Sequence, residues 1–316
     1  MIEATALTKS YGQKTAVDGV DFIVEPGKVT GFLGPNGAGK STTMRMIVGL
    51  DRPTSGRVIV NGKPYREHRA PLREVGALLD AKAIHTGRSA TNHLLAMGAT
   101  HGIGAARVRE VIEITGLQSV ANKRVGGFSL GMGQRLGIAA ALLGDPATLI
   151  LDEPINGLDP EGVRWVRTLV RSLAAEGRTV LLSSHLMSEM ALTADHLIVL
   201  GRGRIIANAP VSDVIAMSSA AVVRVRTPHT DDLMRLFPAA GITVRRTAPD
   251  ALELEGVTAA DIGDAAARAG LALHELTPVV GSLEDAYLRL TDDDVEYRTA
   301  TTDTLTRPAA TTEVAR

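Results

Sequence analysis

The sequence predicts an α/β fold built on a parallel sheet, followed by a small α+β domain. Three observations lead to this expectation. A glycine-rich octapeptide, Gly34 to Ser41, lies between a strand-like and a helix-like segment. An apolar run, Leu149 to Leu151, ends in two acidic residues, and the pattern of the chain changes after Met217. Buried apolar strands, and glycine-rich loops between a strand and a helix, are both typical of parallel sheets.

The octapeptide reads GPNGAGKS and matches a phosphate-binding loop. Its glycines let phosphate oxygens approach the backbone N–H groups, and Lys40 adds a mobile positive charge. The strand-like segment Val29 to Leu33 precedes it, and Ser41 to Leu50 follows with helical spacing, so a helix N-terminus faces the phosphates. Ser41 is then left to ligate Mg²⁺. The expected nucleotide contacts are Gly34, Pro35, Asn36, Gly37, Ala38, Gly39, Lys40, Ser41 and Thr42.

Composition narrows the classes of protein. The 316 residues are 45% hydrophobic, and we expect two domains. No run of about 18 apolar residues predicts a membrane span. The most apolar region, Leu136 to Leu151, is interrupted at residues 144–146 and predicts a helix followed by a buried strand. The absence of cysteine excludes disulfides and thiolate metal sites, and a net charge of −1 offers no general attraction for nucleic acid.

Two acidic residues, Asp152 and Glu153, follow the apolar run Leu149 to Leu151. Such a run is typical of a strand buried on both faces, and its carboxyl end lies at the edge of a parallel sheet where ligands bind. We therefore expect Asp152 to hold Mg²⁺ through water and Glu153 to polarise the attacking water. Two acids at a strand end can also simply begin a loop, but the upstream phosphate-binding loop favours the catalytic interpretation.

The segment Phe128 to Arg135 reads FSLGMGQR, and with it the chain resembles the ATP-binding subunits of ABC transporters. It looks like a degenerate form of that family's LSGGQ signature. Ser129 and Gly131 match the serine and the second glycine. Leu130 and Met132 replace the first glycine and the glutamine. The structural alternative is an ordinary helix start, capped by Ser129 ahead of an apolar helix that contains Leu136, Ile138, Ala139, Leu142 and Leu143.

Further motifs follow in the order typical of the family. Tyr11 of LTKSYG matches the aromatic residue that stacks on adenine, although it can also be an ordinary half-buried aromatic. Asp159 of INGLDP matches the loop that touches the opposite subunit. His185 of TVLLSSH matches the switch histidine at the γ-phosphate, although it can also be a core histidine. The resemblance covers about Met1 to Met217 and implies a P-loop NTPase domain with a helical signature subdomain.

Asp80 departs from the family pattern. The family usually places glutamine after the strand Val75 to Leu79, where its amide contacts Mg²⁺ and faces the membrane partner. Aspartate is one methylene shorter but charged, so a direct contact with Mg²⁺ and no contact are equally open. The next segment, Ala81 to Gly98, would couple to the membrane partner, but ordinary packing explains its apolar residues as well.

The resemblance implies an ATPase subunit of an ABC exporter, closest to drug- and antibiotic-resistance exporters, with ATP and Mg²⁺ as cofactors. Glu153 and His185 would be catalytic. Two copies would meet head to tail, with each ATP between the phosphate-binding loop of one and Ser129 and Gly131 of the other. A separate permease chain would hold the homodimer at the cytoplasmic face of the cell membrane as a peripheral subunit. The cargo, whether drug, antibiotic, lipid or ion, is not encoded here.

Two alternatives belong to other classes. A soluble ABC ATPase that acts on ribosomes or nucleic acid usually carries a second ATP-binding domain or a long coiled-coil insertion, and this chain has neither pattern. A P-loop kinase for a small molecule would leave Ser129, Gly131 and His185 without a role. We therefore expect no nucleic-acid partner.

After Met217 the order of elements changes to strand, helix, strand, strand, helix, strand, which predicts a small ferredoxin-like domain. The helix from Thr258 begins with a capping box that includes Asp261. We expect an ATP-binding domain over 1–217, an accessory α+β domain over 218–290 and a disordered tail over 291–316. The predicted elements are strands at Ala221–Arg226, Ile242–Arg246, Ala251–Glu255 and Leu271–Leu276, helices at Asp231–Phe237 and Thr258–Ala269, and a final helix from Ser282.

Overall fold

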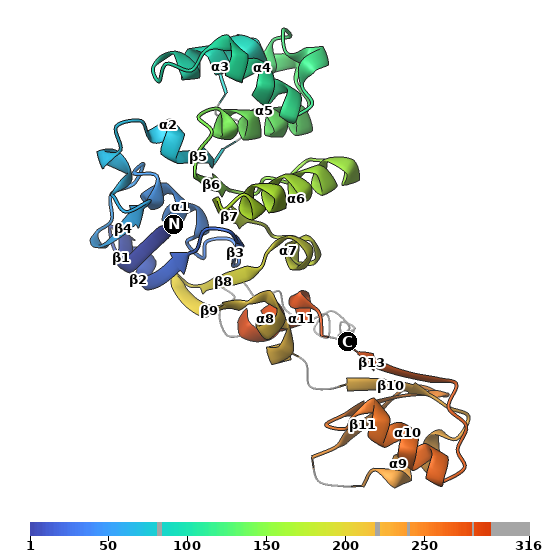
Figure 1. Ribbon diagram of the computed structural model, residues 1–316. Helices are drawn as coiled ribbons and strands as arrows, with labels where there is room; N and C mark the ends of the chain where they lie inside the picture. Colours follow the sequence, from blue (N-terminus) through green and yellow to red (C-terminus); the bar gives the residue numbers. More distant parts are fainter. Residues whose placement is uncertain (81–83, 219–221, 239–240, 280, 292–316) are drawn as a thin grey trace, which may run out of the picture.

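A six-stranded sheet lies at the centre of the computed structural model, which describes residues 1–80, 84–218, 222–238, 241–279 and 281–291 (Figure 1). Its strand order is β5-β6-β7-β3-β8-β9. All pairs are parallel except β8 with β9, which confirms the predicted parallel α/β sheet. The strands are β3 (Val29–Leu33), β5 (Val75–Leu78), β6 (Thr148–Leu151), β7 (Thr179–Ser183), β8 (His196–Gly201) and β9 (Arg204–Pro210).

A three-stranded antiparallel sheet packs beside it, in the order β2 (Lys14–Val24), β1 (Ile2–Tyr11), β4 (Ser55–Val60). Helix α1 (Lys40–Ile47) belongs to the same hydrophobic cluster, to which the central sheet contributes Phe32 and Ile150. Their neighbours Leu33 and Leu149 belong to a second, larger cluster. Successive residues of a strand point to opposite faces, so both faces of the central sheet are buried and its strands read as continuous apolar runs.

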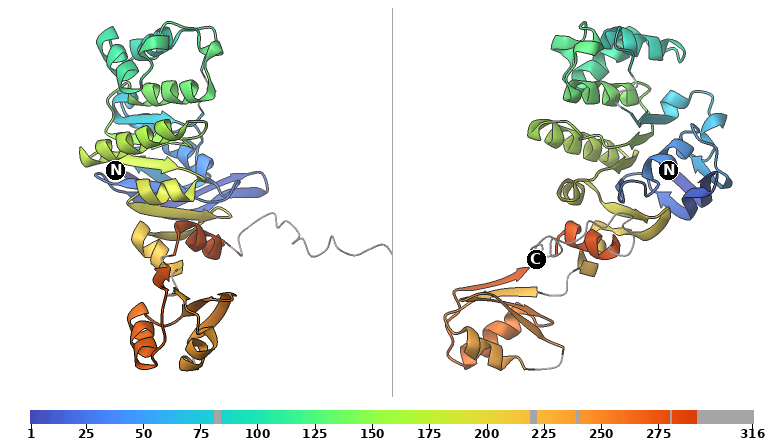
Figure 2. Two further views of the ribbon diagram at one scale, coloured as in Figure 1. Left: turned by 90° about the vertical axis from the view of Figure 1, so that its right-hand side faces the viewer. Right: turned by 180° about the vertical axis from the view of Figure 1, so that it is seen from behind.

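The larger cluster is covered by helices α5 (Leu130–Leu142), α6 (Pro160–Ala175), α7 (Met187–Thr193) and α8 (Val211–Ser218). Helices α3 (Ala90–Ala99) and α4 (Ala105–Ile114) pack with α5 at one end of the molecule (Figures 1 and 2). The interruption at residues 144–146 separates α5 from β6 as predicted. Short helical turns complete this part: α2 (Pro71–Glu74), η1 (Tyr65–Glu67), η2 (Gln118–Val120) and η3 (Val125–Gly127).

A separate four-stranded sheet lies at the opposite end of the molecule, in the order β11-β12-β10-β13 (Figure 2). Every neighbouring pair is antiparallel, which is the split βαβ arrangement that the sequence predicts. Its helices pack on one face around a third cluster that contains Val223, Leu233 and Leu254. The elements are β10 (Val222–Arg226), α9 (Thr230–Leu236), β11 (Thr243–Ala248), β12 (Ala251–Glu255), α10 (Ala259–Arg268) and β13 (Glu275–Val279).

Several element boundaries differ from the sequence prediction. Strand β13 begins at Glu275 rather than Leu271, because the backbone N–H of Leu271 donates to Ala266 O at 2.9 Å and closes the end of α10 instead of joining a ladder. Helix α1 ends at Ile47 rather than Leu50, because Leu50 N–H bonds back to Arg45 O beyond Gly49, which has a φ of +69°. Strand β5 ends one residue early, at Leu78.

Helix α11 (Leu283–Thr291) returns from the accessory sheet to the larger part of the chain. Leu283 and Ala286 are buried in the larger cluster, and the helix packs on α8 and α7. The sequence prediction counts this helix with the accessory domain, whereas its packing places it with the ATP-binding part. The division at 1–217, 218–290 and 291–316 stays a prediction, and residues 292–316 of the predicted tail, with 81–83 of the predicted coupling segment, lie outside the described residues.

Candidate nucleotide-binding site

Three loops meet at the carboxyl edge of the central sheet. Strands β6, β7 and β3 are neighbours, so the segments that begin at Asp152, Ser184 and Gly34 leave the sheet side by side. These segments carry the acidic pair, the histidine and the phosphate-binding loop of the sequence prediction. This edge is where ligands bind in open parallel sheets.

The phosphate-binding loop fits an anion through its backbone. Helix α1 begins at Lys40 without a side-chain cap, so the N–H groups of its first turn are free of side-chain acceptors. Gly39 has a φ of +104°, and a Cβ there would lie 2.5 Å from Ala16 O. A Cβ on Gly34 would lie 2.6 Å from Leu200 O. Only glycine fits at these two positions, where the loop packs directly against the backbone of β2 and β8.

Lys40 is held inside the loop. Its ammonium donates to Gly34 O at 2.6 Å and to Pro35 O at 3.3 Å, and the residue is only 9% exposed. Burial lowers the pKa of Lys40, and the negative charges of Glu153 and Asp152 oppose this shift. A charged group bonded only to neutral carbonyls can exchange them for phosphate oxygens, as the predicted role requires.

Asp152 joins the loop to the sheet edge. Its Oδ2 accepts from Ser41 Oγ at 2.6 Å, and its Oδ1 accepts from Ser183 Oγ at 2.5 Å. The two predicted Mg²⁺ ligands, Ser41 and Asp152, are therefore already in contact. Within the described ranges no group of three or more His, Cys, Asp or Glu side chains could hold a metal ion. An oxygen pair of this kind suits Mg²⁺, which keeps waters and takes phosphate oxygens as its other ligands.

Asp80 lies two residues beyond the end of β5, where Leu78 pairs with Leu151 of β6. It therefore stands at the same sheet edge as Asp152, and it is exposed. Its contact with Mg²⁺ stays a prediction.

Glu153 and His185 contact each other directly. Nδ1 of His185 lies 2.7 Å from Oε2 of Glu153. Glu153 has a φ of +51°, an uncommon conformation for a residue other than glycine. Its backbone N–H donates to Ser183 Oγ at 2.9 Å, which fixes this turn. Backbone strain of this kind concentrates at functional sites, in keeping with the predicted catalytic role.

Two residues of the site carry no role in the sequence prediction. Ser183 bonds both Asp152 and Glu153, and its signal is a polar residue that ends an otherwise apolar strand. Gln134 is 3% exposed and donates from Nε2 to Glu153 O at 2.9 Å. It ties α5, the helix of the signature segment, to the turn of Glu153, and nothing in the local sequence indicates this contact across 19 residues.

Tyr11 ends strand β1 and is 50% exposed, so it is half-buried and both interpretations of the sequence stay open. Its phenol donates to Asp51 Oδ2 at 3.0 Å, and its ring is accessible for stacking. The predicted adenine contact is compatible with this exposure and stays a prediction.

The signature segment lies at the start of α5, where Ser129 Oγ accepts from Met132 N–H at 3.2 Å. It packs against the INGLDP loop, because a Cβ on Gly131 would lie 3.1 Å from Gly157 O. Asp159 caps α6 by accepting from Gly162 N–H at 2.9 Å. In the part of the chain that the structure describes, the side-chain hydrogen bonds of Ser129 and Asp159 stay within their own helix starts, and neither reaches the phosphate-binding loop.

Comparison with known protein families gives two matches. A family model described as ABC transporter matches residues 17–156, and one described as a domain of unknown function (DUF8746) matches residues 221–284.

Among curated proteins, the bacitracin transport ATP-binding protein BcrA of Bacillus licheniformis is 43% identical over 213 residues, which are 66% of this chain and 70% of the relative. The lantibiotic transport ATP-binding protein SrtF of Streptococcus pyogenes is 38% identical, over 65% of this chain and 89% of the relative. The Nod factor export ATP-binding protein I of Rhizobium sp. (strain N33) is 34% identical, over 93% of this chain and 98% of the relative.

Two solved structures show the same architecture. One, described as the ATP binding subunit of an ABC transporter, is 26% identical with a TM-score of 0.63, over 69% of this chain and 92% of that chain. The dimeric cassette MJ0796 is 23% identical, also with a TM-score of 0.63, over 67% of this chain and 99% of that chain, and shows the likeness of fold alone.

Proposed function

The chain belongs to the ATP-binding subunits of ABC transporters, and on this premise we propose that two copies hydrolyse ATP to drive export of an antibiotic or lipid-like molecule through a separate permease. The carrying observation is the chain of contacts Ser41, Asp152, Ser183, Glu153, His185 at the sheet edge. It brings together the groups expected to bind the metal, to act as the catalytic base and to contact the γ-phosphate. The direction of transport and the class of cargo rest on relatives named for bacitracin and lantibiotic transport and for Nod factor export.

The residues would divide the work as follows. Lys40 exchanges its carbonyl partners for the β- and γ-phosphate oxygens, and Ser41 and Asp152 hold Mg²⁺. When bound, the metal neutralises charge on the phosphates. Glu153 accepts a proton from the attacking water, and an N–H of His185 stabilises the charge on the γ-phosphate.

The proposed homodimer is supported by the exposed start of α5, which carries the signature segment. Ser129 caps its own helix, and an exposed helix start is also an anion site. A second copy placed head to tail would present this start to the ATP held by the first. ATP binding then stabilises the closed dimer, and loss of the γ-phosphate releases it. No helix in the described ranges is long and apolar enough to cross a membrane, and we propose that the permease holds the subunit at the cytoplasmic face of the membrane.

The test is the variant Glu153→Gln, which keeps the side chain but removes the base. We expect ATP hydrolysis to fall by about 100-fold or more, ATP binding to persist, and light scattering to show a dimer in Mg-ATP. The matched control Glu255→Gln lies on the accessory sheet and should keep the parental rate. A Glu153→Gln protein that remains a monomer in saturating Mg-ATP, with and without its permease, would overturn the proposed closure.

Export is tested in cells that carry the permease with either the parental chain or Glu153→Gln. Only the parental chain should raise tolerance to bacitracin or a lantibiotic. Equal tolerance for both would refute the proposed coupling of hydrolysis to export of these antibiotics.

A further inference from the structure

Tyr11 lies at the end of a strand, where its backbone position alone does not fix the orientation of its ring. It is the last residue of β1, at a tight turn to β2 in which Gly12 has a φ of +59°. Half of the residue is open to solvent. An exposed aromatic side chain at a hairpin tip samples several rotamers, and a ligand that stacks on it must first pay for its ordering.

The ring is nevertheless held on two sides. Its phenol donates to Asp51 Oδ2 at 3.0 Å. Nζ of Lys9 lies 4.9 Å from the ring centroid and donates to Arg52 O at 2.8 Å, so a tethered cation covers one face of the ring. Only the other face is left for a flat ligand.

Asp51 is itself fixed to the end of α1. Arg45, in the last turn of this helix, donates from Nε to Asp51 Oδ2 at 2.8 Å and from Nη2 to Asp51 Oδ1 at 3.3 Å. The backbone N–H of Asp51 also bonds to Arg45 O. Desolvation and the Asp51 carboxylate raise the pKa of the Tyr11 phenol, as expected for a hydroxyl that donates to a charged acceptor.

We infer that Asp51 is a positioning residue for the nucleotide base, which holds the Tyr11 ring against the carboxyl end of α1. The inference rests on the proposed ATP site. The same helix begins at Lys40 and Ser41, so its one rigid span of eight residues sets the separation between the phosphate loop and the stacking ring. Asp51 thus presents the open ring face in advance, and the base meets a preorganised platform.

The test separates the base from the phosphates. Binding of ATP and of inorganic tripolyphosphate, which has no base, is measured by calorimetry in EDTA so that no hydrolysis occurs. We expect Asp51→Ala and Tyr11→Phe each to weaken ATP binding roughly threefold to tenfold and to leave tripolyphosphate binding unchanged. Because both variants break the same bond, the double variant should be no weaker than the stronger single one.

Two further variants sharpen the result. Asp51→Asn keeps an acceptor for the phenol and should restore most of the affinity for ATP. Asp250→Ala removes a comparable pair, in which Arg226 donates to Asp250 at 2.6 Å on the accessory sheet, and should bind both ligands as the parental chain does.

Several outcomes overturn the inference. Unchanged ATP affinity in Asp51→Ala would remove the positioning role, and additive losses in the double variant would show that the two residues act separately. Equal weakening of tripolyphosphate would mean that Asp51 supports the fold of α1 instead. A parental chain that binds neither ligand would refute the proposed ATP site itself, so the two failures are distinguishable.

Discussion

Nδ1 of His185 lies 2.7 Å from Oε2 of Glu153, so the expected catalytic base and the expected phosphate sensor are hydrogen-bond partners of each other. A neutral imidazole has a single N–H, and a carboxylate can only accept. If that N–H is on Nδ1, Nε2 is an acceptor and offers nothing to a phosphoryl oxygen. A neutral His185 therefore has to leave Glu153 before it can donate to the γ-phosphate, which frees the carboxylate for water at the same moment.

His185→Ala should lower ATP hydrolysis by about 100-fold, the usual effect of losing one donor to a developing oxyanion. The affinity for ATP should change by less than about threefold, because this contact is expected to strengthen only as charge develops in the transition state. Steady-state phosphate release and equilibrium binding measure the two effects. His196, which bonds Asn208 at 2.8 Å, provides the control His196→Ala with a parental rate. Loss of affinity as large as loss of rate would contradict this account.

Ser183→Ala should lower hydrolysis by roughly 10-fold to 100-fold at saturating ATP. The hydroxyl donates to Asp152 Oδ1 at 2.5 Å and accepts from Glu153 N–H at 2.9 Å, so its removal leaves a partly buried N–H without this partner and removes one of the bonds that hold the Asp152 carboxylate. An unsatisfied group of this kind costs about 1–3 kcal/mol. Phosphate release at increasing Mg²⁺ is the measurement, with exposed Ser212→Ala as the control. A parental rate in Ser183→Ala would show that Asp152 and Glu153 are held by other contacts.

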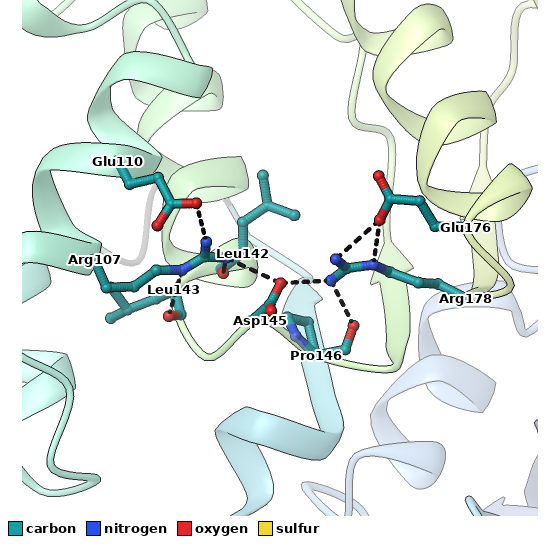
Figure 3. A network of polar contacts seen from close by, with 8 residues as sticks. All are labelled: Arg107, Glu110, Leu142, Leu143, Asp145, Pro146, Glu176 and Arg178. Carbon is teal, nitrogen blue, oxygen red and sulfur yellow. Dashed lines mark hydrogen bonds and ion pairs between the residues drawn. The ribbon is translucent and has the colours of Figure 1, made fainter.

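Asp145 predicts a pH dependence of stability. Its carboxylate accepts from Arg178 at 2.8 Å and from Arg107 at 3.3 Å, which joins α4 to the strand edge of the core (Figure 3). The hydrogen bond from Arg178 lowers the pKa of Asp145, with desolvation opposing it. A carboxyl with a lowered folded pKa stabilises the fold above its ordinary value of about 3.9, and this contribution is lost as the pH falls through the folded value.

The variant Asp145→Asn isolates this effect. Asparagine tolerates the φ of +54° at this position, so the backbone conformation is retained. We expect the Asp145→Asn protein to melt on the order of 1–3 °C below the parental chain at pH 7, since exposed ion pairs contribute little to the free energy of unfolding. The gap should narrow as the pH falls below about 3.9. Thermal melts from pH 7 downward measure this difference in melting temperature. A difference that is constant with pH would exclude the carboxylate as its source.

Helix α11 predicts a contrast between two leucines. Leu283 is 3% exposed in the larger cluster, whereas Leu288 on the same helix is 58% exposed. Leu283→Ala should destabilise the ATP-binding part by about 2–5 kcal/mol, and Leu288→Ala should stay within about 0.5 kcal/mol of the parental chain. Urea unfolding, followed through the ATP-binding part by loss of nucleotide binding, measures both. Equal effects would mean that α11 does not complete the core.

The local parts of the site were predictable from the sequence, and its long-range contacts were not. The phosphate-binding loop and the acids Asp152 and Glu153 are encoded by spacing within a few residues, because strand, loop and helix follow one another along the chain. Ser183 and Gln134 both bond to Glu153, from 30 and 19 residues away along the chain. The pairing of β6 with β7 brings Ser183 to this turn, and the packing of α5 brings Gln134 there.

The same reasoning applies to the fold. Apolar runs and glycine positions predict strands and helix ends, and the alternating order of elements predicts the accessory sheet. An amphipathic helix such as α11 shows that one face is buried but not against which partner. Its packing on α7 and α8 follows from tertiary structure alone, which is why the sequence pattern groups it with the accessory sheet that precedes it.

The path of the chain through α8, the accessory sheet and α11 limits how the protein can be shortened. Truncation near residue 218, after the last motif, would remove Leu283 and Ala286 from the larger cluster and expose the apolar side chains that pack against them. Deletion of residues 222–279 would instead keep α11 and both of these buried residues. An internal deletion can therefore remove the accessory sheet, whereas a C-terminal truncation would also remove α11.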